Sequence, residues 1–428
     1  MCIRDRENEG KFIEKEEDDP DWAEARSILT ELLNNRAEMK SYDRSVMWNY
    51  WGYLYFSDED YDQAMYAYEQ LLKEPEATIP LRTASLLTLA QLNLVKERWD
   101  KGISLILQWM DEVETITAQS YYLLSSAYFQ KEDFVRARSN MEEAIRLAEE
   151  EGYRPKENWY VLLAACFNEL KDRKVIGPEY ALEQQVGIYE ILVNFYPKKQ
   201  YFLQLGYTYQ QMDREEDYML TLKAAYDKDF LDKESEYLAL AQMLLLKKNP
   251  YWAAQVLVAG QEKKVTITDD DTGEEEIVAV LKDKEKTLKL LADAWRMAQE
   301  IDMAIPVLEK AAKMSKDGDT YVLLGNLYLF EDRMDDSIRA IENGLKKPKV
   351  KSRSQALLVL GQAFFELQNF EEAKKHFRAA ARDKNKRIKK TANSWIKYAE
   401  NEEIRVKNLA LRRDFIQQSK AKSKAKNS

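Results

Sequence analysis

The chain has 428 residues, of which 33% are charged, with 13 glycines, 9 prolines and a net charge of −10. So few helix-breaking residues favour helices over strands, and no apolar run approaches the roughly 20 residues of a membrane span. The two cysteines, Cys2 and Cys166, cannot form a disulfide framework. These features predict a helical chain without membrane spans or redox chemistry.

Residues 1–21 are predicted to be a poorly ordered start. The segment MCIRDRENEG lacks the apolar stretch of an export signal, and MCIRDR resembles a translated sequencing-adapter remnant. The helix expected from Trp22 to Leu33 looks like the second of a pair whose first helix, around Phe12 and Ile13, is hardly recognisable. We therefore expect that the natural N-terminus is missing.

The segment from Val46 to Leu72 predicts two amphipathic helices joined by a short polar turn. Trp48, Trp51, Gly52 and Tyr55 lie at i, i+3, i+4 and i+7, which is one face of a helix. Gly52 and Ala64 are small, as expected where two antiparallel helices cross closely.

The same spacing between two small residues, twelve positions apart, recurs along the chain and predicts a repeat. Gly206 occupies the first of these positions in a further unit, in which Tyr218 stands at the second. The remaining pairs are Ala90 with Gly102, Ser125 with Ala137, Ala241 with Ala253, Ala292 with Ala304, Gly325 with Ser337, and Gly361 with Ala373.

These positions predict an array of about nine to ten units over residues 22–404. The helix pairs are expected to begin near Ser45, Thr83, Ala118, Lys156, Lys199, Glu234, Glu285, Gly318 and Ser354. The fourth unit carries extra material at 171–180, and the fifth is expected to open wider or pack irregularly because of Tyr218. A capping helix is expected at 387–404.

Two segments break this rhythm. Residues 264–280 alternate β-branched residues around an acidic turn with Gly273, which predicts a β-hairpin inserted between the sixth and seventh units. Residues 382–428 hold 15 Lys and Arg against 5 Asp and Glu, so residues 1–381 carry a net charge of −20. The end of the chain, 405–428, is predicted to be a basic and partly disordered tail.

The unit pattern resembles the tetratricopeptide repeat (TPR), in which a small residue and a tyrosine on one helix precede a small residue on the next. The resemblance implies an all-α fold: a TPR α-solenoid, a right-handed superhelix of antiparallel helix pairs, here with a small inserted β-hairpin. It also implies a protein that binds other proteins.

Signals of catalysis are lacking in the sequence. His376 is the single histidine, which leaves no histidine-ligated metal cluster and no His–nucleophile pair. There is no phosphate-binding glycine loop and no HExxH motif. We therefore predict no enzyme activity, no catalytic residue, no metal and no cofactor, and the acidic body argues against a nucleic-acid partner.

The TPR resemblance implies that partners bind the first-helix face along the inside of the superhelix. On this chain it is aromatic and rich in amides, which suits an extended peptide. The implied partner-binding residues are Asn49, Tyr53, Phe56, Gln91, Tyr122, Ser126, Phe129, Tyr160, Gln200, Tyr207 and Gln242.

Three strings narrow the resemblance. RTASLLTLAQL at 82–92, PKENW at 155–159 and YPKK at 196–199 resemble those of gammaproteobacterial TPR proteins encoded beside a second TonB system. This resemblance implies a periplasmic accessory protein with TonB- or ExbD-type envelope partners, acting with the TonB–ExbB–ExbD machinery in outer-membrane uptake of iron chelates. A generic cytoplasmic TPR assembly or chaperone-like scaffold is the alternative, and the partner and oligomeric state stay open.

Overall fold

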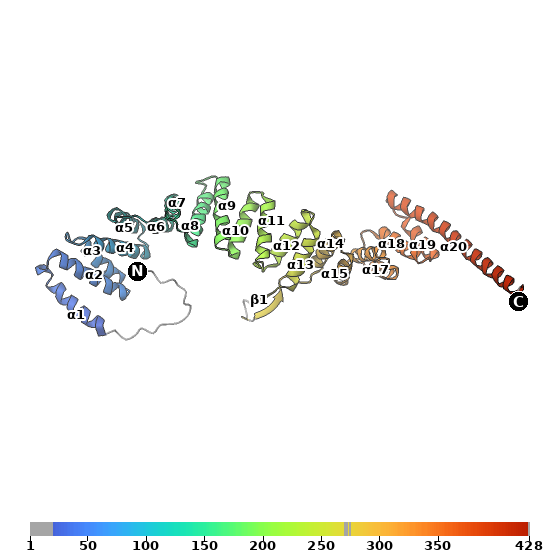
Figure 1. Cartoon of the computed structure of the whole chain (residues 1–428), viewed down its shortest axis with the longest axis horizontal. Coiled ribbons are helices and arrows are strands. Elements are labelled where there is room, and N and C mark those ends of the chain that lie inside the picture. Colours follow the sequence, from blue (N-terminus) through green and yellow to red (C-terminus); the bar gives the residue numbers. More distant parts are fainter. Residues whose placement is uncertain (1–19, 269–272, 274, 427–428) are drawn as a thin grey trace. The chain divides into compact units, whose positions relative to one another are not determined.

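The computed structural model describes residues 20–268, 273 and 275–426 and divides into two compact units, residues 1–218 and 219–428. The predictions for residues 1–19 lie outside the described residues. Each unit consists of antiparallel helix pairs in which a pair packs on the next along the chain (Figure 1). The predicted fold class, all-α with a small inserted hairpin, is confirmed.

Unit 1 begins with a single helix, α1 (Pro20–Asn34), and a 3-10 turn at Arg36–Glu38. Four complete pairs follow, and α10 begins the fifth. Their bounds are α2 (Ser41–Ser57) with α3 (Tyr61–Leu72), α4 (Ile79–Val95) with α5 (Trp99–Glu112), α6 (Ala118–Gln130) with α7 (Phe134–Glu150), α8 (Glu157–Asp172) with α9 (Pro178–Phe195), and α10 (Lys199–Gln211).

Helix α11 (Glu215–Asp227) contains the division between the units. Unit 2 continues with four further pairs and ends in one long helix. Their bounds are α12 (Glu234–Leu246) with α13 (Pro250–Glu262), α14 (Glu285–Met297) with α15 (Ile301–Met314), α16 (Asp319–Phe330) with α17 (Met334–Lys346), α18 (Arg353–Glu366) with α19 (Phe370–Ala380), and α20 (Lys386–Lys426).

The turns inside the pairs share one backbone device. Each contains a polar residue in the left-handed conformation, such as Glu59 (φ 62°) in the first pair and Asp332 (φ 55°) in the eighth. The next residue donates its N–H to a carbonyl near the end of the first helix, as Asp60 does to Tyr55 O at 2.9 Å. This bond satisfies a carbonyl that has no partner within the helix and reverses the chain within a few residues.

The predicted small positions lie where the two helices of a pair meet, and all of them are buried. A Cβ on Gly52 would stand 2.7 Å from the ring of Tyr68 on α3. At two crossings the helices are close enough for a serine to form a hydrogen bond between them: Ser125 Oγ donates to Ala137 O and Ser337 Oγ to Gly325 O, each at 2.7 Å. A larger residue at these positions would force the helices apart.

The inserted hairpin is formed by β1 (Lys264–Thr268) and β2 (Glu275–Ala279), which pair antiparallel from Lys264 opposite Ala279 to Thr268 opposite Glu275. Apart from Gly273 (φ +70°), the residues of its tip lie outside the described residues. At its base, Leu281 N donates to Gly260 O at 2.8 Å, and the Leu281 side chain is buried. The hairpin is therefore attached at the end of α13.

The prediction that the capping helix ends at 404, before a partly disordered tail, is wrong. Helix α20 continues to Lys426, because residues 405–426 contain no glycine or proline and are rich in Ala, Lys, Arg and Gln, which favour helices. Its first part packs on α19 through Trp395, Ala392 and Ala399.

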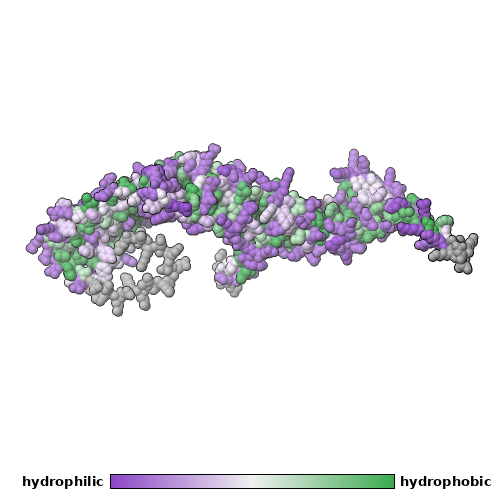
Figure 2. All heavy atoms as spheres, viewed as in Figure 1, coloured by the Kyte–Doolittle hydropathy of each residue, from purple (hydrophilic) through white to green (hydrophobic). Residues whose placement is uncertain are grey.

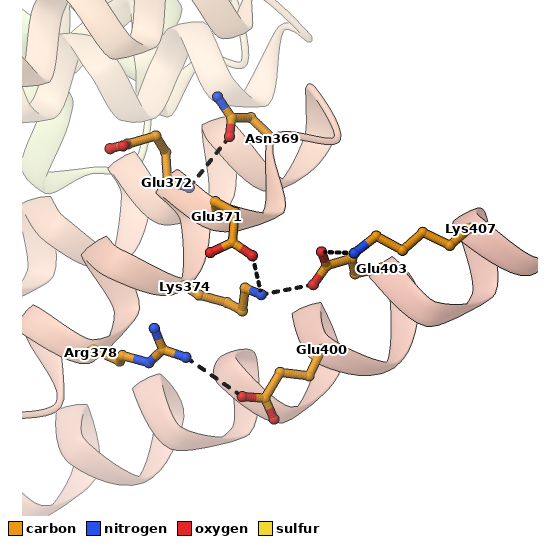
Figure 3. A network of polar contacts seen from close by, with 8 residues as sticks. All are labelled: Asn369, Glu371, Glu372, Lys374, Arg378, Glu400, Glu403 and Lys407. Atoms are coloured by element: carbon orange, nitrogen blue, oxygen red, sulfur yellow. Dashed lines mark hydrogen bonds and ion pairs between the residues drawn. The ribbon is translucent and has the colours of Figure 1, made fainter.

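An ion-pair network around the nearly buried Lys374 joins α20 to α19 (Figure 3). The Lys374 ammonium, on a side chain that is 9% exposed, contacts Glu371 at 2.8 Å and Glu403 of α20 at 2.7 Å. Glu403 also contacts Lys407 at 2.7 Å. Hydrogen bonds from Lys374 and Lys407 lower the pKa of Glu403 to about 2, so this carboxylate stays charged over the physiological range.

Candidate partner-binding surface

The first helices of successive pairs form a common surface within each unit. Helix α2 contacts α4 and α6 contacts α8 in unit 1, while α16 contacts α18 in unit 2. On each first helix, the residues three before, one after and four after the small position lie about 40 to 100° around the helix from it. They therefore turn away from the crossing with the second helix.

On α2 the three predicted residues differ in how accessible they are. Tyr53 is half-buried, because its ring packs on Trp22 of α1 with centroids 5.7 Å apart. Asn49 is also half-buried, whereas Phe56 is 38% exposed, with Tyr61 tilted beside it at 6.0 Å. Of the two aromatic side chains in this group, Phe56 therefore has the larger exposed fraction.

On α6 the predicted residues mainly join this helix to its neighbours. The Tyr122 ring stacks on Trp159 of α8 at 5.5 Å, and Asn158 Nδ2 donates to the Tyr122 hydroxyl at 2.9 Å. Phe129 meets Phe134 edge to face at 5.1 Å. Tyr122 and Phe129 therefore stabilise the α6–α7–α8 packing, and their replacement would disturb structure together with any binding.

The prediction that Tyr160 contributes to this surface is wrong. Tyr160 is 4% exposed and packs in the core around α8. The small residue of α8 is Ala164, with buried Phe167 three residues later; the predicted residues were one position out of phase. The positions that follow the rule are Val161, Ala165 and Asn168, of which Val161 and Asn168 are exposed.

The more accessible part of the predicted set is on α10 and α12, in different units. On α10, Gln200 is exposed and Tyr207 is 58% exposed. On α12, Gln242 is exposed; Gln91 of α4 and Ser126 of α6 are half-buried. The accessible side chains of the predicted set are therefore mainly one or two per helix, with aromatic rings at Phe56 and Tyr207.

Polar contacts between neighbouring pairs, which the spacing of small residues does not predict, hold the first helices against the preceding second helices. Tyr209 donates its hydroxyl to Glu190 Oε1 at 2.6 Å, and Tyr328 bonds Glu309 in the same way, at the same separation along the chain. Burial and the neighbouring carboxylate raise the pKa of both phenols. In the sequence, a glutamate nineteen residues before the tyrosine of a first helix would have predicted both contacts.

The reactive groups lie in unreactive surroundings. Cys166 is fully buried, and burial raises the pKa of its thiol to about 12, so it stays protonated. His376 stacks on Phe364 at 5.4 Å, and burial lowers its pKa. Within the residues described, no group of His, Cys, Asp and Glu side chains is arranged to hold a metal ion.

Over the same residues, no helix combines the length and apolarity needed to cross a membrane.

Comparisons with known proteins identify the repeat. Residues 118–151, which include α6 and α7, and residues 322–387, which include most of α16 to α19, each match a family model described as tetratricopeptide repeat. The chain therefore contains tetratricopeptide repeats in these segments. A search of curated proteins gave no match.

Several solved structures are similar at low identity. A crystal structure of MamA protein is 19% identical over 42% of this chain and 89% of that chain, with a TM-score of 0.33. A tetratricopeptide repeat protein from Parabacteroides merdae is 12% identical over 66% and 98%, with a TM-score of 0.26. The APC/C hetero-tetramer Cut9-Hcn1 is 13% identical over 89% and 81%, with a TM-score of 0.28. Likeness at this level carries no argument about function.

Proposed function

We propose that this chain is a non-enzymatic scaffold that binds an extended segment of a partner protein on the first-helix face. The observation that carries the proposal is the exposure of Phe56 and Tyr207 at equivalent faces of tetratricopeptide first helices, with Asn168 exposed on α8 between them. Aromatic rings offer contact area at a low entropic cost, and an amide can pair with a strand's backbone groups. Cys166 is buried and His376 lies half-buried on the second helix α19, so neither supplies a nucleophile or base at this face.

Site-specific photocrosslinking tests this surface directly. A photoreactive phenylalanine analogue replaces Phe56 or Tyr207, and the matched control replaces Tyr50, which is 56% exposed on the same helix as Phe56 but off the predicted face. We expect partner adducts from the first two positions and few from the third. Equal adducts from all three positions, or none from Phe56 and Tyr207, would place the binding surface elsewhere.

Within this function, we propose the narrower role of a periplasmic accessory protein of a TonB–ExbB–ExbD system. The support is the resemblance of the strings at 82–92, 155–159 and 196–199 to such proteins. Of these, RTASLLTLAQL lies on α4, while PKENW and YPKK lead into α8 and α10. The latter two strings therefore shape the junctions before two first helices.

Two residues of YPKK contact two residues of PKENW. Tyr196 of YPKK donates its hydroxyl to Pro155 O of PKENW at 2.7 Å, and Lys198 pairs with Glu157 at 2.7 Å. The two strings thus contact each other, forming one structural feature with a role in fixing α8 and α10. This contact gives their joint occurrence a physical reason that does not depend on a particular partner.

The narrower role is tested with purified periplasmic domains of TonB and ExbD from the host. We expect either domain to crosslink at Tyr207 and to compete with the envelope-derived adduct. If adducts form only with cytoplasmic proteins, the cytoplasmic scaffold is the correct function and the TonB role is wrong. The scaffold proposal itself survives that outcome, because it requires a partner on the first-helix face and no particular compartment.

A further inference from the structure

The long helix α20 presents an exposed face that nothing in unit 2 covers. Its buried side is formed by residues such as Trp395, Ala399 and Val406, which pack on the cluster that includes Phe377 of α19. Every residue from Lys407 to Lys420 is exposed. Figure 1 shows the helix continuing past α19, and Figure 2 shows apolar patches among hydrophilic ones along it.

The exposed face has a defined chemical order. At 100° per residue, eight side chains from Lys386 to Phe415 fall within about 60° of one another, opposite the packed side. Six of them are lysines or large apolar residues, Lys386, Lys390, Lys397, Ile404, Leu411 and Phe415, and the other two are Asn393 and Asn408. Ile404, Leu411 and Phe415 are 58%, 67% and 71% exposed, so one side of a straight helix carries three lysines followed by three large apolar residues.

The lysines of this face lack the ion pairs that many other lysines and arginines form in the described part of the chain. Lys374 and Lys407, on the network side, are held by carboxylates. None of the ion pairs found among the described residues includes the side chain of Lys386, Lys390 or Lys397. Residues 404–428 add 8 basic residues against the single acidic Asp414. The whole face is therefore a linear cationic surface with an apolar half.

We propose that this face of α20 docks on an anionic phospholipid surface, lying along it rather than crossing it. The face extends over roughly 44 Å in a straight line, which a plane of headgroups can contact along its full length. The lysines pair with the anionic headgroups while Ile404, Leu411 and Phe415 enter the boundary of the acyl chains.

Two further observations fit this occupant. Residues 1–381 carry a net charge of −20, so the array is repelled from an anionic bilayer and contact is confined to α20. A helical segment without tertiary packing is marginally stable in water, and residues 407–420 have none. Docking stabilises this segment by burying its apolar side.

The test uses the purified full chain in flotation with two kinds of vesicle, phosphatidylcholine alone and phosphatidylcholine mixed equally with phosphatidylglycerol. We expect binding to the anionic vesicles only, weakening as salt rises. The triple change Lys386→Gln, Lys390→Gln and Lys397→Gln should lower the affinity roughly a hundredfold. The double change Leu411→Ser with Phe415→Ser should lower it about tenfold or more.

The matched control removes the same charge from another place in unit 2. Lys286→Gln, Lys313→Gln and Lys346→Gln change exposed lysines of α14, α15 and α17 and should leave vesicle binding unchanged. Circular dichroism checks that all variants keep their helix content.

An equal loss in the control, or no binding of the wild-type chain to anionic vesicles, would overturn the proposal. So would a dimer in sedimentation that the α20 lysine changes abolish without any vesicle binding, because the face would then contact the acidic array of a second copy.

Discussion

The eighth and fourth helix pairs reach the same kind of crossing by different routes. In α16/α17, Ser337 Oγ donates to Gly325 O at 2.7 Å, twelve residues away. In α8/α9, Gln185 Nε2 points to Ala164 O at 3.4 Å, across 21 residues. The serine hydroxyl lies next to the backbone and needs the helices close together, whereas the glutamine amide reaches across a wider gap. These two crossings therefore share a small residue whose carbonyl accepts a side-chain hydrogen bond, while the spacing between donor and acceptor differs.

The largest expected effect is on the tight crossing. A side chain at Gly325 would overlap Ile341 and lie 3.2 Å from Ser337 O. Gly325→Val should therefore lower the local free energy of unfolding of α16 and α17 by about 3 kcal/mol or more, measured by native-state hydrogen exchange. Unchanged protection of both helices would show that the crossing can widen freely.

A smaller loss is expected from removing the donor. Ser337→Ala should cost about 1 kcal/mol, since Gly325 O loses a buried partner. Gln185→Leu in α8/α9 should cost less, because its bond to Ala164 O is long at 3.4 Å. Hydrogen exchange of the two pairs measures both, and a larger loss in α8/α9 would mean that the glutamine is the more important donor.

A gain is expected in the wider pair. Gly187 lies inside α9, and a Cβ there would meet nothing within 4 Å. Gly187→Ala should raise the free energy of unfolding of α9 by roughly 0.5 to 1 kcal/mol, because alanine restricts the unfolded chain more than glycine does. The opposite results expected at Gly325 and Gly187 separate a glycine required by packing from one that is not.

The same contrast explains what could be predicted from the sequence. Small residues twelve apart located the tight crossings, since a short turn of constant length keeps the spacing fixed. Around α8 the spacing fails, because the turn at 173–177 is longer than the turn at 331–333 and the crossing lies farther from the turn on both helices. Gln185 also replaces the small residue, and the first-helix face was placed at Tyr160 in place of Val161.

The spacing of small residues does not predict which side chains contact one another. Tyr122 matches the partner-binding positions, yet its ring stacks on Trp159. The length of α20 was missed for another reason, since a basic, polar composition was interpreted as disorder although its residues favour helix. Composition alone does not separate a solvated helix from a disordered tail.

The smallest expected effect is a pH dependence of stability. It arises where the start of a first helix contacts the end of its second helix, and it should differ between the regular pairs and α8/α9. In α2/α3, Arg44 binds Glu74 through Nε and Nη2 at 2.9 and 2.7 Å, and in α4/α5 Arg82 binds Glu112 at 3.2 and 3.0 Å. In α8/α9 the neutral Tyr196 hydroxyl donates to Pro155 O at 2.7 Å. The first two contacts depend on a charged carboxylate and the third does not. Glu157 of α8 also has a lowered pKa, but its partners Lys198 and Tyr201 follow α9 and lie outside that helix.

The hydrogen bonds from Arg44 and Arg82 lower the pKa of Glu74 and Glu112 below the ordinary carboxylate value. A lowered folded-state pKa contributes stability that is fully present above the unfolded-state pKa and is lost as the pH falls through the folded-state pKa. Acidification from neutral pH should therefore lower the exchange protection of α3 and α5 by a few-fold, the scale of a partly exposed ion pair, after correction for intrinsic exchange rates. Protection of α9 should change less, and Glu74→Gln should remove the pH dependence of α3 while leaving that of α5. If α9 loses protection with the same pH profile as α3, the Arg–Glu contacts are not the cause, and the pairs differ only in how closely their helices cross.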